Sequence, residues 1–147
     1  MNGTFDHKDE FIKNNGYYMS TPQGNSMRPF IRGGRDSVVM TAFDGNVGKY
    51  DVILYRAPDG HHVMHRVLGV KDGTCRVRGD NCFYNERVPF DRISAKMDHL
   101  IRNGNREVRQ TFSYLLLVRL WRAAYPFRFC LHFSKKAVKA LLRRARR

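Results

Sequence analysis

Cysteine is scarce in this sequence, which contains three cysteines among 147 residues. A small, odd number excludes the disulfide framework typical of a small secreted domain. Cys75 and Cys82 follow three histidines at positions His61, His62 and His65. Their spacing matches no closed Cys/His zinc motif, and the two adjacent histidines would point to opposite faces of a strand. We therefore expect no metal ligands here.

Long hydrophobic runs are also lacking. The segment from Met1 to Gly24 is polar, so we expect neither a secretory signal nor a membrane span in it. The most apolar run, residues 111–125, is interrupted by Arg119 and Arg122. Because a bilayer requires about 20 predominantly apolar residues and a central arginine is costly, this run predicts a helix on a membrane surface. The alternative is a helix that packs on the rest of the protein.

Acidic residues are scarce near the C-terminus. Residues 1–101 contain 14 Lys and Arg against 12 Asp and Glu, whereas residues 102–147 contain 13 against one. This change predicts a nearly neutral domain over 1–101 and a basic, amphipathic helical tail over 102–147. We expect Pro126 to interrupt the tail and Ser134 to begin its second helix. Such a tail favours anionic lipid headgroups as ligands, with nucleic acid as the less favoured alternative.

Most of the first region has the pattern of short β-strands. Runs rich in Val, Ile, Tyr and Met alternate with turn-forming pairs such as Asp59-Gly60 and Asp72-Gly73, which are typical of hairpins. We expect a short helix over residues 6–14 and strands over residues 17–20, 37–43, 52–56, 62–70, 74–78 and 93–96. The fold class is therefore mainly β, a small antiparallel and partly barrel-like domain.

Three short segments carry the side chains that nucleophilic acyl transfer requires. Ser26 lies in a turn bounded by glycine and proline, His65 in a β-type run, and Asp80 in a tight turn. A serine hydroxyl attacks a carbonyl only if a neighbouring base removes its proton, and histidine titrates near neutral pH without help. A carboxylate at the other ring nitrogen fixes the tautomer and stabilises the imidazolium. Taken singly, the serine also fits a turn hydroxyl and the histidine a core residue.

The order and spacing of these segments resemble the catalytic boxes of the type I signal peptidases and of the related self-cleaving LexA-type peptidases. The segments that carry the resemblance are Gly24-Asn25-Ser26-Met27-Arg28-Pro29, Val63-Met64-His65-Arg66-Val67 and Gly79-Asp80-Asn81, with residues 33–39 and 50–55. Most bacterial signal peptidases have a lysine where this chain has His65, whereas the endoplasmic-reticulum-like and archaeal branch has a histidine. The resemblance covers residues 17–100 and implies a serine peptidase fold with a Ser/His dyad.

The resemblance also implies a role for each site residue. Ser26 is the nucleophile, His65 is the general base, and Asp80 is the carboxylate that supports the base. Asn85 stands where the Ser/His branch usually has a further acid, which leaves Glu86 as the alternative to Asp80. The proposed chemistry requires no cofactor.

Substrate binding follows from the same resemblance. The family binds an extended peptide as a strand beside the segments that precede the serine and the base. We expect this cleft between residues 19–24 and residues 62–64, with an oxyanion hole formed by the backbone N–H groups of Asn25 and Ser26. The residues expected to contact the substrate are Gly24, Met27 and Met64.

Together these patterns predict a serine endopeptidase that cleaves an extended segment of a protein or peptide, as in signal-peptide processing. We expect it to be membrane-associated through its basic tail, or cytoplasmic. One alternative is a soluble processing or self-cleaving peptidase like the LexA group, although no helix-turn-helix pattern precedes the domain and no lysine occupies the base position. Another is a non-catalytic module whose basic tail binds lipid or nucleic acid.

Overall fold

The computed structural model describes residues 3–134 and divides into two compact units, Met1–Thr111 and Phe112–Arg147. The first unit includes the hairpin formed by β7 (Ile93–Arg102) and β8 (Arg106–Arg109). The charge pattern placed the boundary after residue 101, within β7. The strand pairing of β7 with β8 explains why the unit extends to Thr111.

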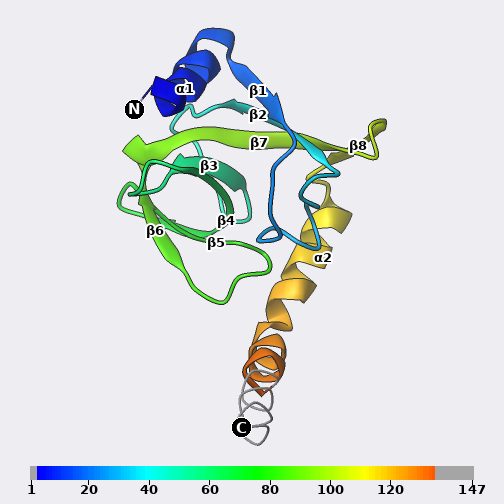
Figure 1. Cartoon of the computed structure of the whole chain (residues 1–147). Helices are drawn as coiled ribbons and strands as arrows, with labels where there is room; N and C mark the ends of the chain where they lie inside the picture. The colour runs from blue at the N-terminus through cyan, green and yellow to red at the C-terminus, as the bar shows by residue number, and fades with distance from the viewer. Residues whose placement is uncertain (1–2, 135–147) are drawn as a thin grey trace, which may run out of the picture. The chain divides into compact units, whose positions relative to one another are not determined.

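The first unit is mainly β and antiparallel, which confirms this part of the predicted fold class. Its elements in chain order are α1 (Gly3–Asn15), β1 (Tyr17–Ser20), β2 (Ser37–Ala42), β3 (Val52–Arg56), β4 (His62–Lys71), β5 (Thr74–Arg78), β6 (Glu86–Pro89), the 3-10 turn Phe90–Arg92, β7 and β8. The strand order is β1-β2-β7-β3-β4-β5-β6, and β8 pairs with β7 (Figure 1). Among the described residues no pairing joins β6 to β1, so the sheet curls but remains open and is not a closed barrel.

Strand β3 lies in the middle of the sheet and is buried on both faces. Successive side chains of a strand point to opposite faces, so Val52 and Leu54 pack in one core cluster while Ile53 and Tyr55 pack in another. The first cluster also contains Ile12, Met27, Ile31, Val38, Met40, Ala95, Met97 and Leu100, and the second contains Val67, Cys75, Val77, Val88 and Ile93. Burial on both faces explains why β3 is a continuous apolar run without polar alternation.

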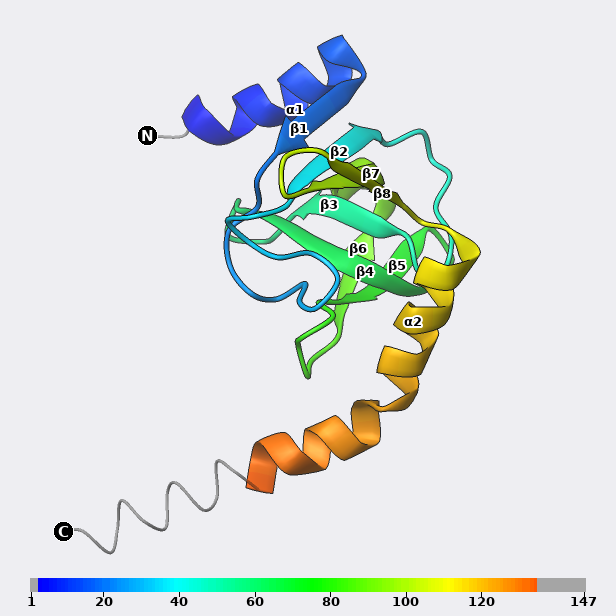
Figure 2. The ribbon, with the colours of Figure 1, turned by 90° about the vertical axis from the view of Figure 1, so that its right-hand side faces the viewer.

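Helix α1 is fixed to the sheet by an apolar contact and a charged one. Ile12 is fully buried in the first core cluster. The Asp9 carboxylate pairs with Arg56 of β3 and lies 2.7 Å from Nε2 of His62 on β4. Burial raises the pKa of Asp9, but hydrogen bonds from Ser94, His62 and Arg56 outweigh it and place the pKa below its ordinary value. These contacts hold α1 beside β1 and β2 (Figure 2).

The second unit begins with helix α2 (Phe112–Ala123). After a turn at Ala124, residues 125–134 are again helical, and Pro126 lies in the first turn of this segment, where proline is well tolerated. The second helix therefore begins before Ser134, whose hydroxyl donates to the Cys130 carbonyl one turn earlier. The basic and apolar residues predicted to follow Ser134 lie outside the described residues.

Large apolar side chains are exposed along both helical segments of the second unit. Tyr114 and Val118 are buried. The exposed side chains are Phe112, Leu116, Leu117, Leu120, Phe127, Phe129, Leu131 and Phe133. Within residues 3–134, the structure contains no helix that is both long and apolar enough to cross a bilayer.

Candidate active site

Ser26 lies in the loop that connects β1 to β2. Gly24 adopts a φ of 89°, a left-handed conformation that favours glycine. A Cβ on Gly33 would lie 2.0 Å from the Gly24 carbonyl oxygen, so two parts of the loop touch backbone to backbone. Met27 and Ile31 are buried in the first core cluster. Backbone packing and apolar side chains together fix the position of the serine turn.

A buried carboxylate holds the end of the same loop. Asp36 accepts hydrogen bonds from the backbone N–H and the side chain of Arg32 and from Arg102 of β7. Burial raises the pKa of Asp36, but these hydrogen bonds outweigh it and keep the pKa below its ordinary value. Arg102 also donates to the Phe30 carbonyl oxygen at 2.7 Å. The loop is thereby tied to a central strand of the sheet.

The Ser26 turn meets the turn that follows β5. The backbone N–H of Asn81 donates to the Ser26 carbonyl oxygen at 2.7 Å, and the Asn81 side-chain amide donates to the Asn25 carbonyl at 3.4 Å. Gly79 lies between the serine and the histidine, because a Cβ built on it would be 2.7 Å from the Ser26 carbonyl oxygen and 3.0 Å from His65 Nε2. The fold thus brings the three predicted segments together.

His65 lies on β4 with its side chain almost fully buried. Its Nδ1 is 2.9 Å from Oε1 of Glu86 on β6 and 3.1 Å from the hydroxyl of Tyr55 on β3. The Tyr55 hydroxyl donates to the other Glu86 oxygen at 2.9 Å. Burial, and then the Glu86 carboxylate, strongly raise the pKa of Tyr55, so its hydroxyl stays protonated and acts as a donor. Glu86 therefore accepts from both the phenol and the imidazole.

The surroundings of His65 keep its ring neutral at neutral pH. Burial lowers the pKa of His65, and the charges of Glu86 and Asp80 offset this only in part, so the pKa lies below 6.5. The hydrogen-bond pattern places the ring proton on Nδ1, which leaves the Nε2 lone pair as an acceptor. Within residues 3–134, no side chain or backbone group hydrogen-bonds either Nε2 or the Ser26 hydroxyl. His65 is therefore a neutral base with an available nitrogen beside the serine turn.

Asp80 contacts Arg66, whereas the sequence suggested that it would contact the His65 ring. Its two oxygens accept hydrogen bonds from Nε and Nη2 of Arg66 at 2.8 and 2.7 Å, and both side chains are almost completely buried. Nη1 of Arg66 donates to the Tyr50 carbonyl at 2.9 Å, and its guanidinium lies 5.4 Å from the centre of the Phe30 ring. The carboxylate that contacts the imidazole is Glu86, the alternative that the sequence left open. Asp80 instead joins the turn that follows β5 to β4.

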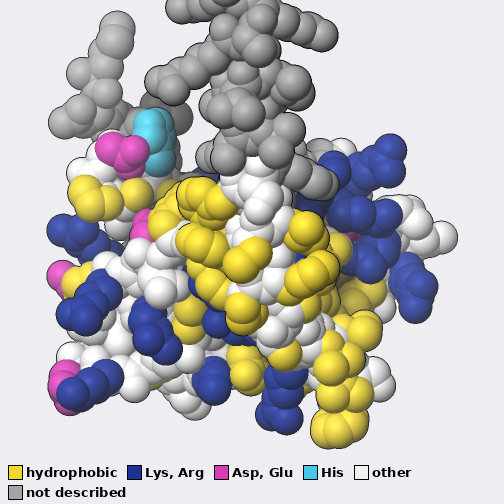
Figure 3. Space-filling view, turned by 90° about the horizontal axis from the view of Figure 1, so that it is seen from below, with side chains coloured by type: hydrophobic (Ala, Val, Ile, Leu, Met, Phe, Trp, Pro, Cys, Tyr) yellow, Lys and Arg dark blue, Asp and Glu magenta, His cyan; other side chains and the backbone are white. Residues whose placement is uncertain are grey.

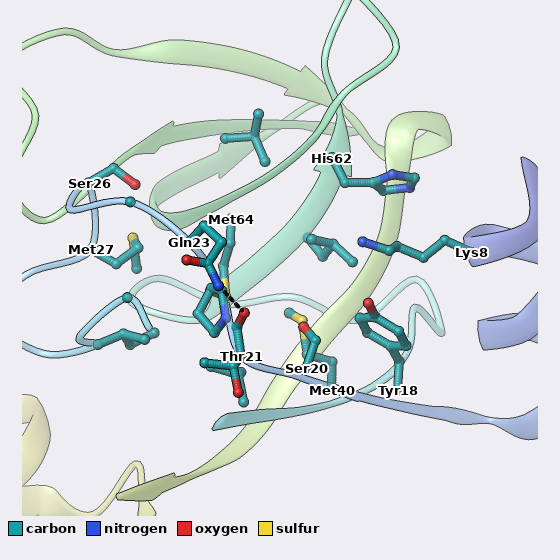
Figure 4. A pocket seen from close by; sticks show the side chains of 17 residues that line it. Lys8, Tyr18, Ser20, Thr21, Gln23, Ser26, Met27, Met40, His62 and Met64 are labelled. Atoms are coloured by element: carbon teal, nitrogen blue, oxygen red, sulfur yellow. Dashed lines mark hydrogen bonds between the residues drawn. The ribbon is translucent and has the colours of Figure 1, made fainter. Parts of the chain in front are cut away.

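A cleft of about 440 Å³ opens beside Ser26. It is lined by residues 20–24 and 62–64, the two segments between which the sequence placed it, and by Tyr18. Its apolar lining includes Met27, Val38, Met40, Leu54 and Met64. Figure 4 shows Ser26 towards one end of the cleft and the side chains of His62 and Lys8 towards the other. All three predicted substrate contacts, Gly24, Met27 and Met64, line this cleft.

Two strand segments next to the cleft have an unpaired edge among the described residues. Strand β1 pairs only with β2 and ends the sheet. In β4, residues 62–65 pair with β3, whereas the pairing with β5 begins at Arg66. The backbone N–H groups of Asn25 and Ser26 also make no hydrogen bond to a described residue. The cleft therefore offers backbone groups to an extended chain and two N–H donors beside the serine.

Sequence reasoning missed two side chains of this site. Tyr55 reads as one residue of a buried strand, and its hydroxyl matters only because β3 and β6 bring it to Glu86. Arg66 carried a usable signal, since a charged side chain on an apolar strand requires a buried acid. Cys82 lies near the same point, with a Cβ on Gly79 only 2.8 Å from its sulfur, but burial raises the pKa of this thiol and favours its unreactive form. No group of three or more potential metal-binding side chains occurs among the described residues.

No protein-family model matches this chain, and no curated protein matches it in sequence. A functional assignment therefore rests on the geometry of Ser26, His65 and Glu86 and on the cleft beside them.

Proposed function

We propose that this protein is a serine endopeptidase in which Ser26 is the nucleophile, His65 is the general base and Glu86 orients the base. The observation that carries the proposal is the meeting of the Ser26 turn with His65 Nε2 on the two sides of Gly79. The neutral state of His65 and its contact with Glu86 add support. The proposal retains the resemblance to signal peptidases and LexA-type peptidases but replaces Asp80 with Glu86 as the supporting carboxylate.

The reaction follows from these positions. Ser26 Oγ attacks the substrate carbonyl carbon while His65 Nε2 takes the hydroxyl proton. The backbone N–H groups of Asn25 and Ser26 donate to the negative oxygen of the tetrahedral intermediate. Collapse breaks the peptide bond, and His65 gives its proton to the leaving amine. A water molecule then attacks the acyl-enzyme with the same base, which releases the acid and restores Ser26.

Substrate binding completes the nucleophile–base contact. Ser26 is half-buried and its hydroxyl has no hydrogen bond to a described residue, so the hydroxyl is available to donate to His65 Nε2 in the substrate complex. Catalytic hydrogen bonds are often long before substrate binds and shorten in the complex. Glu86 then stabilises the imidazolium that forms, because the Glu86 carboxylate already contacts Nδ1 at 2.9 Å.

The substrate proposed for this site is an extended stretch of a protein or peptide. Unpaired edges of β1 and of residues 62–65 supply backbone hydrogen bonds on the two sides of the cleft. The apolar lining formed by Met27, Met40 and Met64 suits apolar side chains near the scissile bond. Flexible methionines adapt to side chains of different shape.

The second unit supports a proposal about where the enzyme acts. Its two helical segments expose eight large apolar side chains, and residues 102–147 contain 13 Lys and Arg against one acid. Figure 3 shows hydrophobic side chains exposed on the face that it presents. Apolar insertion combined with positive charge is the physical basis of peripheral binding to anionic lipid. We therefore place the proposed peptidase at an anionic membrane surface.

An active-site probe tests the enzyme directly. A fluorophosphonate should label the full chain, and mass spectrometry should locate the adduct at Ser26. Ser26→Ala should abolish labelling, whereas the exposed Ser113→Ala control in the other unit should label normally. Absence of labelling at neutral pH, with Ser26→Ala folded and otherwise indistinguishable from wild type, would support the non-catalytic module instead. Ser26-dependent shortening of the chain itself would support the self-cleaving alternative.

Vesicles test the tail separately. The full chain should cosediment with phosphatidylserine-containing vesicles, bind neutral phosphatidylcholine vesicles weakly, and lose most binding to anionic vesicles as salt rises. Leu117→Glu with Leu120→Glu should reduce vesicle binding without changing probe labelling. Binding of equal strength to a polynucleotide, unaffected by these two substitutions, would favour nucleic acid as the ligand.

A further inference from the structure

Lys8 of helix α1 lines the cleft that begins at Ser26. Its neighbours attach this part of α1 to the sheet, because Asp9 pairs with Arg56 and His62, and Ile12 is fully buried. Figure 4 shows the Lys8 side chain reaching into the end of the cleft opposite Ser26. A helix that contributes nothing to the proposed chemistry thus places a cation on the substrate path.

The charge of Lys8 is not neutralised by a described carboxylate. Its ammonium group lies 5.1 Å from the centre of the Tyr18 ring, and no described acid forms an ion pair with it. The adjacent Asp9 carboxylate is engaged by Arg56 and His62. No Asp or Glu occurs among the residues that line the cleft. This end of the cleft is therefore cationic, while the rest of its lining is apolar or uncharged.

Strand geometry gives the distance between this cation and the scissile bond. His65, beside the serine turn, and His62, beside Lys8, are three positions apart on β4, which corresponds to about 10 Å. A peptide laid along the β4 edge with its scissile bond at Ser26 would bring a residue about three to five positions away to the Lys8 end. Alternate side chains in between would face the apolar lining around Met64.

We propose that Lys8 determines substrate specificity by binding an acidic side chain located about three to five residues from the scissile bond. The preferred substrate segment is then apolar near the cleaved bond and carries an Asp or Glu at that distance. This inference rests on the proposed function for the cleavage site, but its binding step does not require catalysis. Lysine is suited to this role because its charge lies at the end of a flexible stem that adapts to the carboxylate position.

A binding experiment with Ser26→Ala full-length protein tests the inference without cleavage. The probes are fluorescein-labelled peptides of eight Ala and Val residues in which one position carries Glu, Gln or Lys. The Glu peptide should bind about two- to five-fold more tightly than the Gln peptide, the range for a partly exposed ion pair. Adding Lys8→Gln should remove this difference, and adding Lys8→Glu should make the Lys peptide the best ligand. Lys13→Glu is the matched control, because Lys13 is on the same helix but outside the cleft.

A cleavage experiment separates this inference from the proposed function. A library of cellular peptides is digested with the wild-type chain, and the cleavage sites are read by mass spectrometry. Enrichment of Asp and Glu about three to five residues from the cleaved bond, lost in Lys8→Gln, supports the inference. Ser26-dependent cleavage with no such enrichment overturns the role of Lys8 and leaves the peptidase intact. Absence of Ser26-dependent cleavage overturns the peptidase, and equal binding of the three probe peptides by Ser26→Ala overturns the role of Lys8 as well.

Discussion

Two acid–base pairs lie back to back on strand β4, His65 with Glu86 and Arg66 with Asp80. Neighbouring side chains of a strand point to opposite faces, so each pair belongs to a different side of the sheet. In the second pair both side chains are at most 1% exposed, whereas the Glu86 side chain is 30% exposed. The guanidinium donates through Nε, Nη1 and Nη2, but Nε2 of His65 has no hydrogen-bond partner among the described residues.

In the proposed mechanism, this difference separates a structural pair, Arg66 with Asp80, from a catalytic pair, His65 with Glu86. A buried pair whose groups are all satisfied holds its segments together and has nothing left to exchange with a substrate. The imidazole instead has one nitrogen fixed by Glu86 and Tyr55 and the other available next to the serine turn. An available atom on a well-held ring is what a general base requires. His65 and Arg66 are adjacent in sequence, yet their expected roles differ because only His65 keeps a nitrogen without a hydrogen bond to a described residue.

Replacing Glu86 with Gln should have the largest effect on reactivity. The amide can donate to Nδ1, which moves the ring proton to Nε2 and removes the base that Ser26 needs. We expect the rate of fluorophosphonate labelling to fall by about 10²–10⁴-fold, with little change in the unfolding free energy. Labelling reactions quenched at successive times measure the labelling rate, and urea denaturation measures the unfolding free energy. A labelling rate equal to that of wild type would remove Glu86 from the mechanism.

Replacing Asp80 with Asn should have its main effect on stability. The substitution leaves the buried Arg66 charge without its carboxylate, which we expect to lower the unfolding free energy by about 3–5 kcal/mol. The double variant Arg66→Met with Asp80→Leu should recover most of this loss, because no buried charge remains unpaired. Urea denaturation of the three proteins checks this. A fully stable Asp80→Asn protein that no longer labels would restore Asp80 as the supporting carboxylate.

The pH dependence of labelling should report on His65. Its folded-state pKa lies below 6.5, so the labelling rate should rise with pH, with a midpoint below 6.5, and be constant near neutrality. In Glu86→Gln the midpoint should shift to still lower pH, because the carboxylate charge raises this pKa. Asp91→Asn is the exposed control. A midpoint above 6.5 would contradict burial as the dominant influence on the ring.

The same pKa determines how His65 affects stability. The unfolded chain binds the proton more readily than the folded one, so the stability contribution of neutral His65 is complete above pH 6.5 and is lost as the pH falls towards the folded pKa. His65→Gln, which cannot titrate, should therefore show a shallower loss of unfolding free energy between neutral and acidic pH. Parallel losses in both proteins would show that another group is responsible.

Replacing Tyr55 with Phe should have the smallest effect. The variant loses the hydroxyl contacts to Glu86 and His65 but keeps the ring in the second core cluster. One neutral-donor hydrogen bond to a carboxylate contributes about 1.5–3 kcal/mol at most, and the partly exposed Glu86 can bind water in compensation. We expect labelling to slow by about ten-fold or less. A loss as large as that of Glu86→Gln would make Tyr55 an equal partner in orienting the base.

Local patterns predicted much of the fold. Residues 52–56 and 74–78 form strands with the predicted ends, because continuous apolar runs bounded by turn residues leave little choice. Strand β6 (Glu86–Pro89) was not predicted, since its four residues include two charges and a proline and only pairing with β5 makes them a strand. The predicted strand at 93–96 extends to Arg102 because it pairs with β2 and β8, which local sequence does not reveal.

The sequence did not decide whether Asp80 or Glu86 contacts the His65 ring. The aspartate lies in a turn that resembles a family motif, which made it the first choice. The outcome depends on which cation each carboxylate reaches, and that follows from β4 placing Arg66 and His65 on opposite faces. The missing β6 is also the strand that carries Glu86 to the imidazole. The unpredicted strand and the unpredicted contact of Glu86 with His65 thus have the same origin.

Gly79 makes the contact between the Ser26 turn and His65 sensitive to mutation. A methyl group at this position would lie within 3.0 Å of the Ser26 carbonyl oxygen, the Cys82 sulfur and His65 Nε2 simultaneously. Alanine here would therefore push the Ser26 turn away from His65 and should abolish the proposed activity, although every proposed catalytic side chain would remain chemically intact. A copy of this chain that lost its glycine would still contain all three sequence motifs, so the motifs alone would not reveal that the proposed activity had been lost.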